Sequence, residues 1–199
     1  MRKEKLEELE NLMEKYKTKE IRNLHQEANG YIKIEEAEFL LGNDKIISRD
    51  RYTKGGCDAS CSIILPVLEN GELVFVVQPR VYTKNTVTVE APAGMINKEE
   101  LAEEAARREL EEETGCVPEK IIKLVEGYGD PGSSSGITNL FIALNAKKVK
   151  EQHLDEDEYL SLFTCTYEEA LELIEKGYLC DISTLFILEK AKKYLEKSE

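Results

Sequence analysis

Two apolar runs separated by an Asn-Gly turn are the feature that most limits how this chain can fold. The runs Cys61–Leu68 and Leu73–Gln78 are joined by a short polar segment that contains Asn70 and Gly71. Asn-Gly between two apolar runs is a strong hairpin signal, because tight hairpin turns need a positive φ, which Gly and Asn adopt most readily. The sequence therefore predicts an antiparallel hairpin in the core sheet.

Length and composition indicate one globular body with an appendage. The chain has 199 residues, of which 41% are apolar and 34% are charged. A domain of about 150 residues already buries roughly two-thirds of its unfolded surface. No apolar run approaches the roughly 20 residues of a membrane span, and the first residues lack the apolar segment of about 7–15 residues of a secretory signal. We expect a soluble, cytoplasmic protein with no membrane partner.

Net charge and the cysteine pattern restrict which partners and metal sites are expected. The formal net charge is −13, which would repel nucleic acid, so a nucleic-acid partner is not expected. An anionic substrate would need metal ions to bridge it to an acidic site. The five cysteines are scattered and lack the paired Cys or His ligands of a zinc site. Free thiols in a reducing cytosol are the prediction.

Three regions follow from the changes of pattern along the chain. Residues 1–30 place leucines at helical spacing among alternating Lys and Glu, which predicts a helical arm over 1 to about 28. Residues 31–56 carry β-branched and aromatic residues in two segments, Tyr31–Leu40 and Lys45–Tyr52, which predicts a small β lobe that is a candidate for dimerisation. Residues 57–199 form the main body.

Further elements of the main body are predicted by the same rules. Pro92-Ala93-Gly94 breaks the chain before a run of helix formers over Lys98–Thr114, which Gly115 stops. The predicted later elements are strands at Ile121–Gly127, Asn139–Leu144 and Leu160–Cys165, and helices at Tyr167–Lys176 and Asp181–Leu195.

The predicted helix over Lys98–Thr114 carries the chemistry. Glu109, Glu112 and Glu113 stand at i, i+3 and i+4, so they share one helix face. Three carboxylates there repel one another unless a cation lies among them. Hard divalent ions favour such oxygen ligands, and Mg²⁺ also binds substrate phosphates. The cluster predicts Mg²⁺ or Mn²⁺ with a phosphate-bearing ligand; the alternative is a solvated helix in a chain with 40 acidic residues.

The spacing around this cluster resembles a known motif, the Nudix box. Gly94 is followed by five residues and Glu100, and seven residues later comes the run Arg108-Glu109-Leu110-Glu111-Glu112-Glu113-Thr114-Gly115-Cys116. The one departure is Cys116, which replaces an aliphatic residue but packs as a small hydrophobe. This resemblance favours the metal site over a solvated helix. It implies an α/β (α+β) Nudix fold with a mixed β-sheet sandwiched between helices.

The resemblance also implies roles for the residues of the box. Glu109 and Glu113, helped by Glu112 and the Ala93 carbonyl, would hold the metal ions. Gly94 would shape the loop, and Arg108 would orient the glutamates. Glu100 would tie the loop to the helix.

Shorter motifs resemble the ADP-ribose pyrophosphatase subgroup of this family. Val77-Gln78-Pro79-Arg80 is similar to its Q-x-R element, and Glu90-Ala91-Pro92-Ala93-Gly94 is similar to its E-x-P-A-G element. This implies that Arg80 and Glu90 contribute to substrate binding. An Arg offers a planar fork for a bidentate phosphate contact, and the alternative is a surface salt bridge.

The acidic segment Asp155–Glu158 resembles the subgroup's C-terminal acidic loop. By this resemblance Glu158 would position or deprotonate the attacking water. Glu156 is the alternative for that role, and a plain solvated loop is the other reading. The chain has no Trp for a base clamp, and Tyr52, Tyr82 and Phe39 are available for stacking, although an aromatic on a strand more often belongs to the core.

The resemblance implies metal-dependent hydrolysis of a nucleoside diphosphate linked to another group. ADP-ribose, cleaved to AMP and ribose 5-phosphate, is the leading substrate. The alternatives are a GDP-mannose or other nucleotide-sugar pyrophosphatase, a sensor that binds a nucleotide sugar without cleaving it, and a scaffold that works through the charged arm. The fold resemblance also implies a homodimer.

Overall fold

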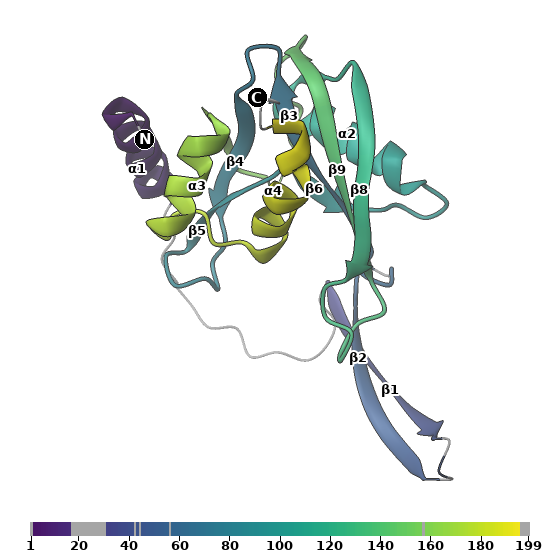
Figure 1. The fold of residues 1–199 in the computed structure, drawn as a ribbon. Coiled ribbons are helices and arrows are strands. Elements are labelled where there is room, and N and C mark those ends of the chain that lie inside the picture. The colour runs from purple at the N-terminus through teal and green to yellow at the C-terminus, as the bar shows by residue number, and fades with distance from the viewer. Residues whose placement is uncertain are drawn as a thin grey trace.

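The structure is a computed structural model that describes residues 2–16, 31–41, 43, 45–55, 57–156 and 158–195. These residues form a mixed β-sheet with helices on both faces and a two-stranded sheet that extends away from it (Figure 1). No helix among the described residues is long and apolar enough to cross a membrane.

The predicted hairpin is the centre of the main sheet. Strands β3 (Cys61–Leu68) and β4 (Leu73–Pro79) pair antiparallel, with Val67 opposite Leu73. The turn between them closes with a 2.8 Å hydrogen bond from Leu68 N to Glu72 O, and Gly71 has a φ of 85°. Most residues of both strands are buried and the rest are half-buried, which confirms a hairpin in the core sheet.

The remaining strands extend this hairpin on both sides. Strand β9 (Ile137–Lys148) pairs parallel with β3, β8 (Lys120–Tyr128) pairs antiparallel with β9, and β10 (Ser161–Cys165) pairs antiparallel with β4. All three overlap the strands expected from the sequence. Three short strands were not predicted: β5 (Val87–Glu90), β6 (Ala93–Met95) and β7 (Cys116–Val117). They are two to four residues long, and pairing with longer strands stabilises them, so no local periodicity marks them.

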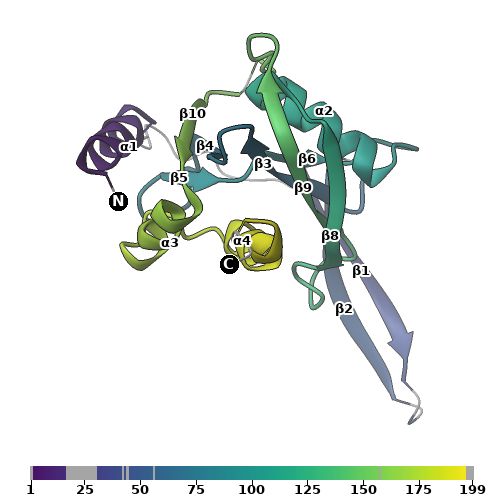
Figure 2. The same cartoon turned by 45° about the horizontal axis from the view of Figure 1, so that its top comes forward.

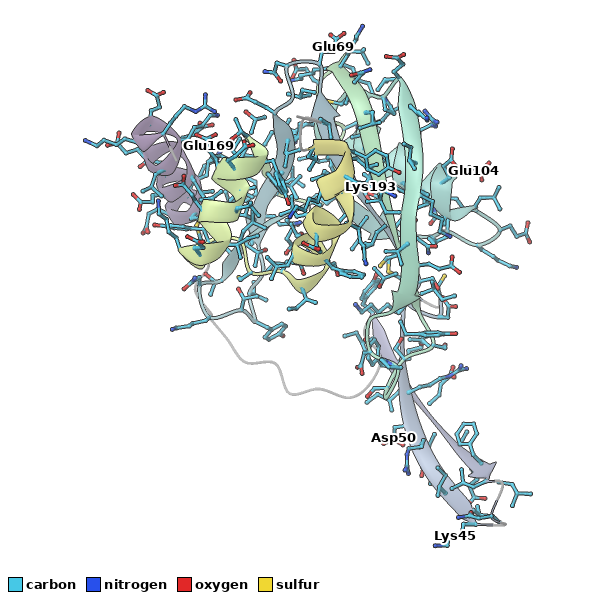
Figure 3. The ribbon with its side chains drawn as sticks, in the orientation of Figure 1. Lys45, Asp50, Glu69, Glu104, Glu169 and Lys193 are labelled. Carbon is cyan, nitrogen blue, oxygen red and sulfur yellow. The ribbon has the colours of Figure 1, made fainter. Side chains whose placement is uncertain are left out.

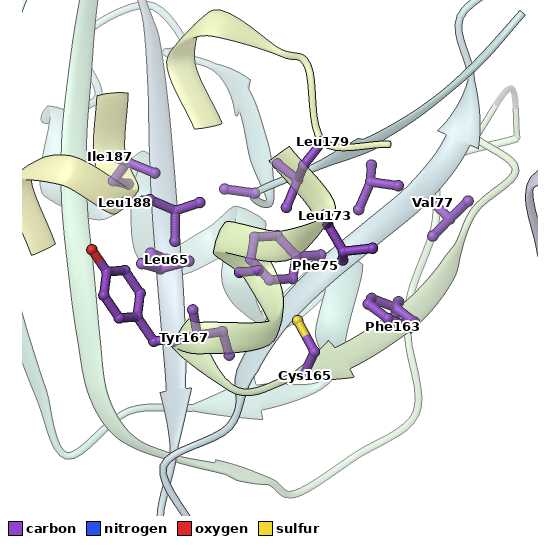
Figure 4. Packing of buried hydrophobic residues seen from close by; sticks show 14 of the residues in the cluster. Leu65, Phe75, Val77, Phe163, Cys165, Tyr167, Leu173, Leu179, Ile187 and Leu188 are labelled. Atoms are coloured by element: carbon purple, nitrogen blue, oxygen red, sulfur yellow. The ribbon is translucent and has the colours of Figure 1, made fainter. Parts of the chain in front are cut away.

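Helices cover both faces of the sheet, which confirms the predicted mixed sheet between helices. Helix α2 (Ala102–Thr114) lies on one face, and α3 (Tyr167–Glu175) and α4 (Ile182–Leu195) lie on the other (Figure 2). Leu110 on α2 packs in one buried cluster. The other cluster lies between the sheet and the remaining helices, where Phe75 packs with Leu173 (Figure 4). Burying one such leucine stabilises the fold by about 1.5–3 kcal/mol.

Helix α2 begins later than the sequence predicts, at Ala102 instead of Lys98. Residues 97–100 form a turn instead, in which Asn97 N donates to the Glu100 carboxylate at 2.8 Å and Glu99 has a φ of 67°. A positive φ is incompatible with a right-handed helix, so the helix starts only after this turn. Its end at Gly115 agrees with the prediction, and the φ of Gly115 is 70°.

The N-terminal arm is helical where the structure describes it. Helix α1 spans Lys3–Tyr16, and residues 17–30 lie outside the described part of the chain. Leu9, Met13 and Tyr16 are buried against the body. The Arg2 guanidinium lies 2.7 Å from the Glu169 carboxylate at the start of α3, and this pairing lowers the pKa of Glu169 to about 2.

Residues 31–55 form a separate two-stranded antiparallel sheet. Strands β1 (Ile32–Leu40) and β2 (Ile46–Lys54) pair from Ile32 opposite Lys54 to Leu40 opposite Ile46. The hairpin extends from the main body, with Asp50 along it and Lys45 near its tip (Figure 3). All of β1 is exposed. The division of the chain at residues 30 and 56 stays a prediction.

Candidate active site

One cavity of about 550 Å³ collects residues from five parts of the chain. The end of β4 contributes Arg80, the β6 segment contributes Ala93 and Gly94, and helix α2 contributes its carboxylates. The acidic segment before β10 closes another side, and Tyr31 also reaches the cavity. The fold thus brings together most of the residues that the sequence singles out.

The three glutamates of α2 line this cavity together. Glu109 and Glu113 are buried, with 7% and 2% of their surfaces exposed, whereas the side chain of Glu112 is 40% exposed. Arg108 Nη1 lies 2.6 Å from Glu109 Oε1 and 3.1 Å from Glu112 Oε2, and Glu113 Oε2 accepts a hydrogen bond from Ala93 N at 3.0 Å. Arg108 and the backbone therefore engage all three carboxylates.

The carboxylates lie close enough to shift one another's protonation. Burial raises the pKa of Glu113 to about 9, and the negative charges of Glu109 and Glu158 add to the rise. Burial also raises the pKa of Glu109, while Arg108 opposes that shift. Removal from water disfavours the charged form of a carboxyl group, and a neighbouring cation restores it. The cluster is therefore a place where added positive charge is strongly stabilising.

The backbone at Gly94 touches the glutamates directly. A Cβ built on Gly94 would lie 1.7 Å from Glu109 Oε1 and 2.0 Å from its Cδ. Any side chain there would displace the Glu109 carboxylate. The hard oxygen donors of this cradle suit Mg²⁺ or Mn²⁺. In the described part of the chain, however, no three acidic, His or Cys side chains already converge on one metal position.

Arg108 links the loop to the helix. Its Nε and Nη2 donate to the two oxygens of Glu100 at 2.9 and 3.1 Å, and Nη2 also donates to the Met95 carbonyl at 3.0 Å. The guanidinium holds the pKa of Glu100 below its ordinary value. Glu100, Met95 and the glutamates thus share one cation.

Arg80 and Glu90 form a bidentate pair at the edge of the cavity. Arg80 Nε and Nη2 donate to the two carboxylate oxygens of Glu90 at 2.9 and 2.7 Å. Glu90 is buried and also accepts from Thr88 and Gln78. Arg80 lines the cavity, and Glu90 lies behind it. A guanidinium carries five N–H donors, so Nη1 can still face an anion.

The acidic segment places one of its two candidate glutamates at the cavity. Asp155 and Glu158 line it, and Glu158 Oε2 accepts from Asp155 N at 2.9 Å. Glu156 is exposed and is not among the described lining residues, and Asp157 lies outside the described part. This geometry favours Glu158 over Glu156.

The aromatic residues at the cavity are not the three that the sequence offers for stacking. Tyr31 and Tyr159 line it, whereas Tyr52, Tyr82 and Phe39 are not among its described lining residues. Tyr82 is 99% exposed, and the other two lie on the β1–β2 hairpin. Tyr159 directly follows Glu158 in the sequence, and this adjacency could have predicted its place at the cavity. Tyr31 carries no comparable local signal.

Comparisons with known proteins identify the family of the chain. The sequence profile of the NUDIX domain matches residues 60–185. The ADP-ribose pyrophosphatase of Bacillus subtilis is 34% identical over 167 residues, covering 83% of this chain and 84% of that protein. The methanol dehydrogenase activator of Bacillus methanolicus is 31% identical, covering 84% and 86%, and the GDP-mannose pyrophosphatase of Yersinia enterocolitica is 29% identical, covering 86% and 95%.

One solved structure shares the fold. A crystal structure of an ADP compounds hydrolase superposes with a TM-score of 0.71 at 18% identity, covering 87% of this chain and 90% of that one. At this identity the likeness shows the fold alone.

Proposed function

Because this chain belongs to the Nudix hydrolase family, we propose that it hydrolyses the diphosphate bond of a nucleotide sugar, with ADP-ribose as the leading substrate. The chain matches the family profile over more than half its length. The observation that carries the proposal is the single cavity in which the box glutamates face Arg80 and Glu158. For ADP-ribose, the products are AMP and ribose 5-phosphate.

The residues of the cavity suit a divalent metal ion. Glu109, Glu112, Glu113 and the Ala93 carbonyl are the groups that would hold Mg²⁺ or Mn²⁺. The tight approach of Gly94 to Glu109 and the raised pKa of Glu113 support this donor set. When bound, such an ion supplies Lewis-acid stabilisation of charge on the diphosphate.

The other residues act on the substrate and on water. Arg80, fixed by Glu90, presents its guanidinium to a phosphate oxygen. Glu158 accepts a proton from the attacking water or orients it for in-line attack at phosphorus. Arg108 keeps the glutamates in place through Glu100 and the Met95 carbonyl. AMP or the sugar phosphate leaves as the bond to the bridging oxygen breaks.

A second candidate substrate is favoured by one specific observation. The GDP-mannose pyrophosphatase relative covers 86% of this chain, nearly the same share as the ADP-ribose pyrophosphatase relative. The diphosphate chemistry is shared, so only contacts to the base and the sugar would differ. Tyr31 and Tyr159 are the aromatic side chains at hand for such contacts.

A substrate panel tests the proposal. We expect EDTA-sensitive hydrolysis with a preference for ADP-ribose over ADP-glucose, GDP-mannose, NADH, diadenosine polyphosphates and nucleoside triphosphates. The measurement is phosphate release in the presence of added phosphatase, with Mg²⁺ and then with EDTA. A preference for GDP-mannose would replace the leading substrate. Binding of a nucleotide sugar without turnover would replace hydrolysis by a sensor function.

We also propose a homodimer in the cytoplasm. All five cysteines are free thiols, which suits a reducing compartment. The β1–β2 hairpin exposes the apolar residues Ile34, Leu40 and Ile46 to between 67% and 71%. Apolar surface of this kind is typical of a face that pairs with another subunit.

Light scattering is expected to give twice the subunit mass of 22.6 kDa. Ile34→Lys should shift the protein to the monomer mass, because it places a charge in the proposed interface. Leu171→Lys alters another exposed apolar residue, on α3, and should leave the dimer intact. A wild-type protein with the mass of one subunit would refute the dimer.

A further inference from the structure

We propose that Tyr16, at the end of the N-terminal helix α1, is a positioning residue that holds the acidic segment 155–158 against the cavity. The proposal rests on the proposed function in one respect, since it takes Glu158 as the group that handles the attacking water. Figure 2 shows α1 beside β10, the strand into which this segment leads. The helix therefore lies where it can act on the site from outside.

Tyr16 contacts the chain immediately after Glu158. Its ring centroid lies 4.4 Å from that of Tyr159, with the planes inclined by 52°. Its hydroxyl lies 2.6 Å from Ser161 Oγ. Lys15 Nζ also lies over both rings, at 5.0 and 5.7 Å from their centroids. Aromatic pairs and a buried hydroxyl bond are both directional, so they fix the position of this stretch as well as cover it.

The other end of the acidic segment is held by the box helix. His153 N donates to the Glu112 carbonyl at 2.8 Å, and Gln152 Nε2 donates to the Glu113 carbonyl at 2.6 Å. Within the segment, Glu158 N donates to the Asp155 carbonyl, and Asp155 N donates to the Glu158 carboxylate. The described residues of the segment thus lie between two anchors. The downstream anchor is Ser161, which pairs with Val77 of β4 and whose hydroxyl Tyr16 also contacts.

Tyr16 itself is firmly held. Only 2% of its surface is exposed, and Leu9 on the same helix is fully buried. Arg2 ties the start of the helix to Glu169 and Glu72. Packing alone explains Leu9, whose buried neighbours belong to the main core. Tyr16 differs because its polar and ring contacts are made with the residues that flank Glu158.

A small shift of a group that orients the attacking water lowers the reaction rate strongly. A misplacement of about 1 Å caused by a distant change can lower a rate by roughly a hundredfold. Loss of the Tyr16 contacts would loosen Tyr159 and the chain up to Ser161, where β10 joins the sheet, while the upstream end of the segment stays attached to α2. We therefore expect a larger effect on turnover than on substrate affinity, because Arg80 and the α2 glutamates keep their places, whereas Tyr159, which also lines the cavity, loses its ring contact.

Three variants test this inference. Tyr16→Leu removes the ring and the hydroxyl, Tyr16→Phe removes only the hydroxyl, and Leu9→Ala opens a cavity in the same helix without touching the segment. We expect Tyr16→Leu to lower kcat by roughly ten- to a hundredfold and to change KM by less than kcat. Tyr16→Phe should restore most of the turnover, and Leu9→Ala should lower the melting temperature while kcat remains at the wild-type value.

Hydrogen exchange provides a second readout that does not depend on turnover. In Tyr16→Leu, the amides of Asp155 and Glu158 should exchange roughly tenfold faster or more, whereas the amide of His153 stays protected by its bond to α2. Leu9→Ala should leave all three unchanged. Equal effects of Tyr16→Leu and Leu9→Ala on exchange would overturn the inference. Wild-type protein without turnover on any substrate would refute the proposed function alone, and the exchange comparison would still decide the role of Tyr16.

Discussion

Glu113→Gln is expected to abolish measurable hydrolysis, a loss of roughly a thousandfold, without unfolding the protein. Glu113 is the most buried carboxylate of the cavity and, as we propose, a ligand of the metal ion. Glutamine has nearly the same shape and can accept the hydrogen bond from Ala93 N, but it lacks the charge. We expect Glu112→Gln to act in the same direction. Turnover is measured with saturating Mg²⁺ and the preferred nucleotide sugar.

The stability of the Glu113→Gln variant follows from the pKa of the carboxyl group. The folded protein holds the proton up to about pH 9, and the unfolded chain releases it near 4.5. Between these values the folded state binds more protons, so the stability of the metal-free protein falls as the pH rises. Glutamine removes this dependence. The metal-free variant should therefore melt at or above the wild-type temperature at pH 8.

Glu111→Gln is the matched control for this change. Glu111 lies two residues before Glu113 on α2, but it pairs with Lys150 at 3.0 Å and is not among the described lining residues of the cavity. Its substitution should leave turnover at the wild-type rate. Wild-type turnover in Glu113→Gln would refute the role that we assign to this residue.

Gly94→Ala is expected to lower turnover by roughly a hundredfold or more, through a single added methyl group. The new Cβ would lie 1.7 Å from Glu109 Oε1, a separation that real atoms do not adopt. The clash is with the end of the Glu109 side chain, so the fold survives, but the Glu109 carboxylate must leave its position beside Gly94. We expect the Mg²⁺ concentration for half-maximal activity to rise as well, because one metal ligand is displaced.

Gly127→Ala provides the control for the glycine substitution. Gly127 lies on β8, and a Cβ built on it meets nothing within 4 Å. This variant should match the wild type in turnover and in Mg²⁺ dependence. An unchanged Mg²⁺ dependence in Gly94→Ala would contradict the proposal that Glu109 binds the metal.

Local sequence pattern was sufficient to predict the long helices and strands and the Nudix box. The Asn-Gly turn and its flanking runs marked the β3–β4 hairpin, and the i, i+3, i+4 spacing placed Glu109, Glu112 and Glu113 on one helix face. These features depend on neighbours in sequence, since the turn needs positive φ and the helix repeats every 3.6 residues. The geometry of these features is therefore set by residues that are close in the sequence.

Tertiary structure decided which residues form the cavity. It also explains where the predicted elements differ from the observed ones. The start of α2 moved to Ala102 because of a turn that Glu100 stabilises, and β5 to β7 exist only because longer strands pair with them. Tyr31 and Tyr159, rather than Tyr52, Tyr82 or Phe39, reach the cavity, because sheet order and helix packing determine which distant segments meet.

The sequence by itself thus determined the helix that carries the acidic cluster, the central hairpin and the membership of a family. Only the folded chain shows that Arg108 already engages two of the three glutamates, and that Tyr16, more than 130 residues before the acidic segment, lies against its flank. The physical reason is the range of the interactions. Backbone conformation is set by residues that are close in the sequence. Burial, charge pairing and ring contacts instead join segments that can lie far apart in the sequence.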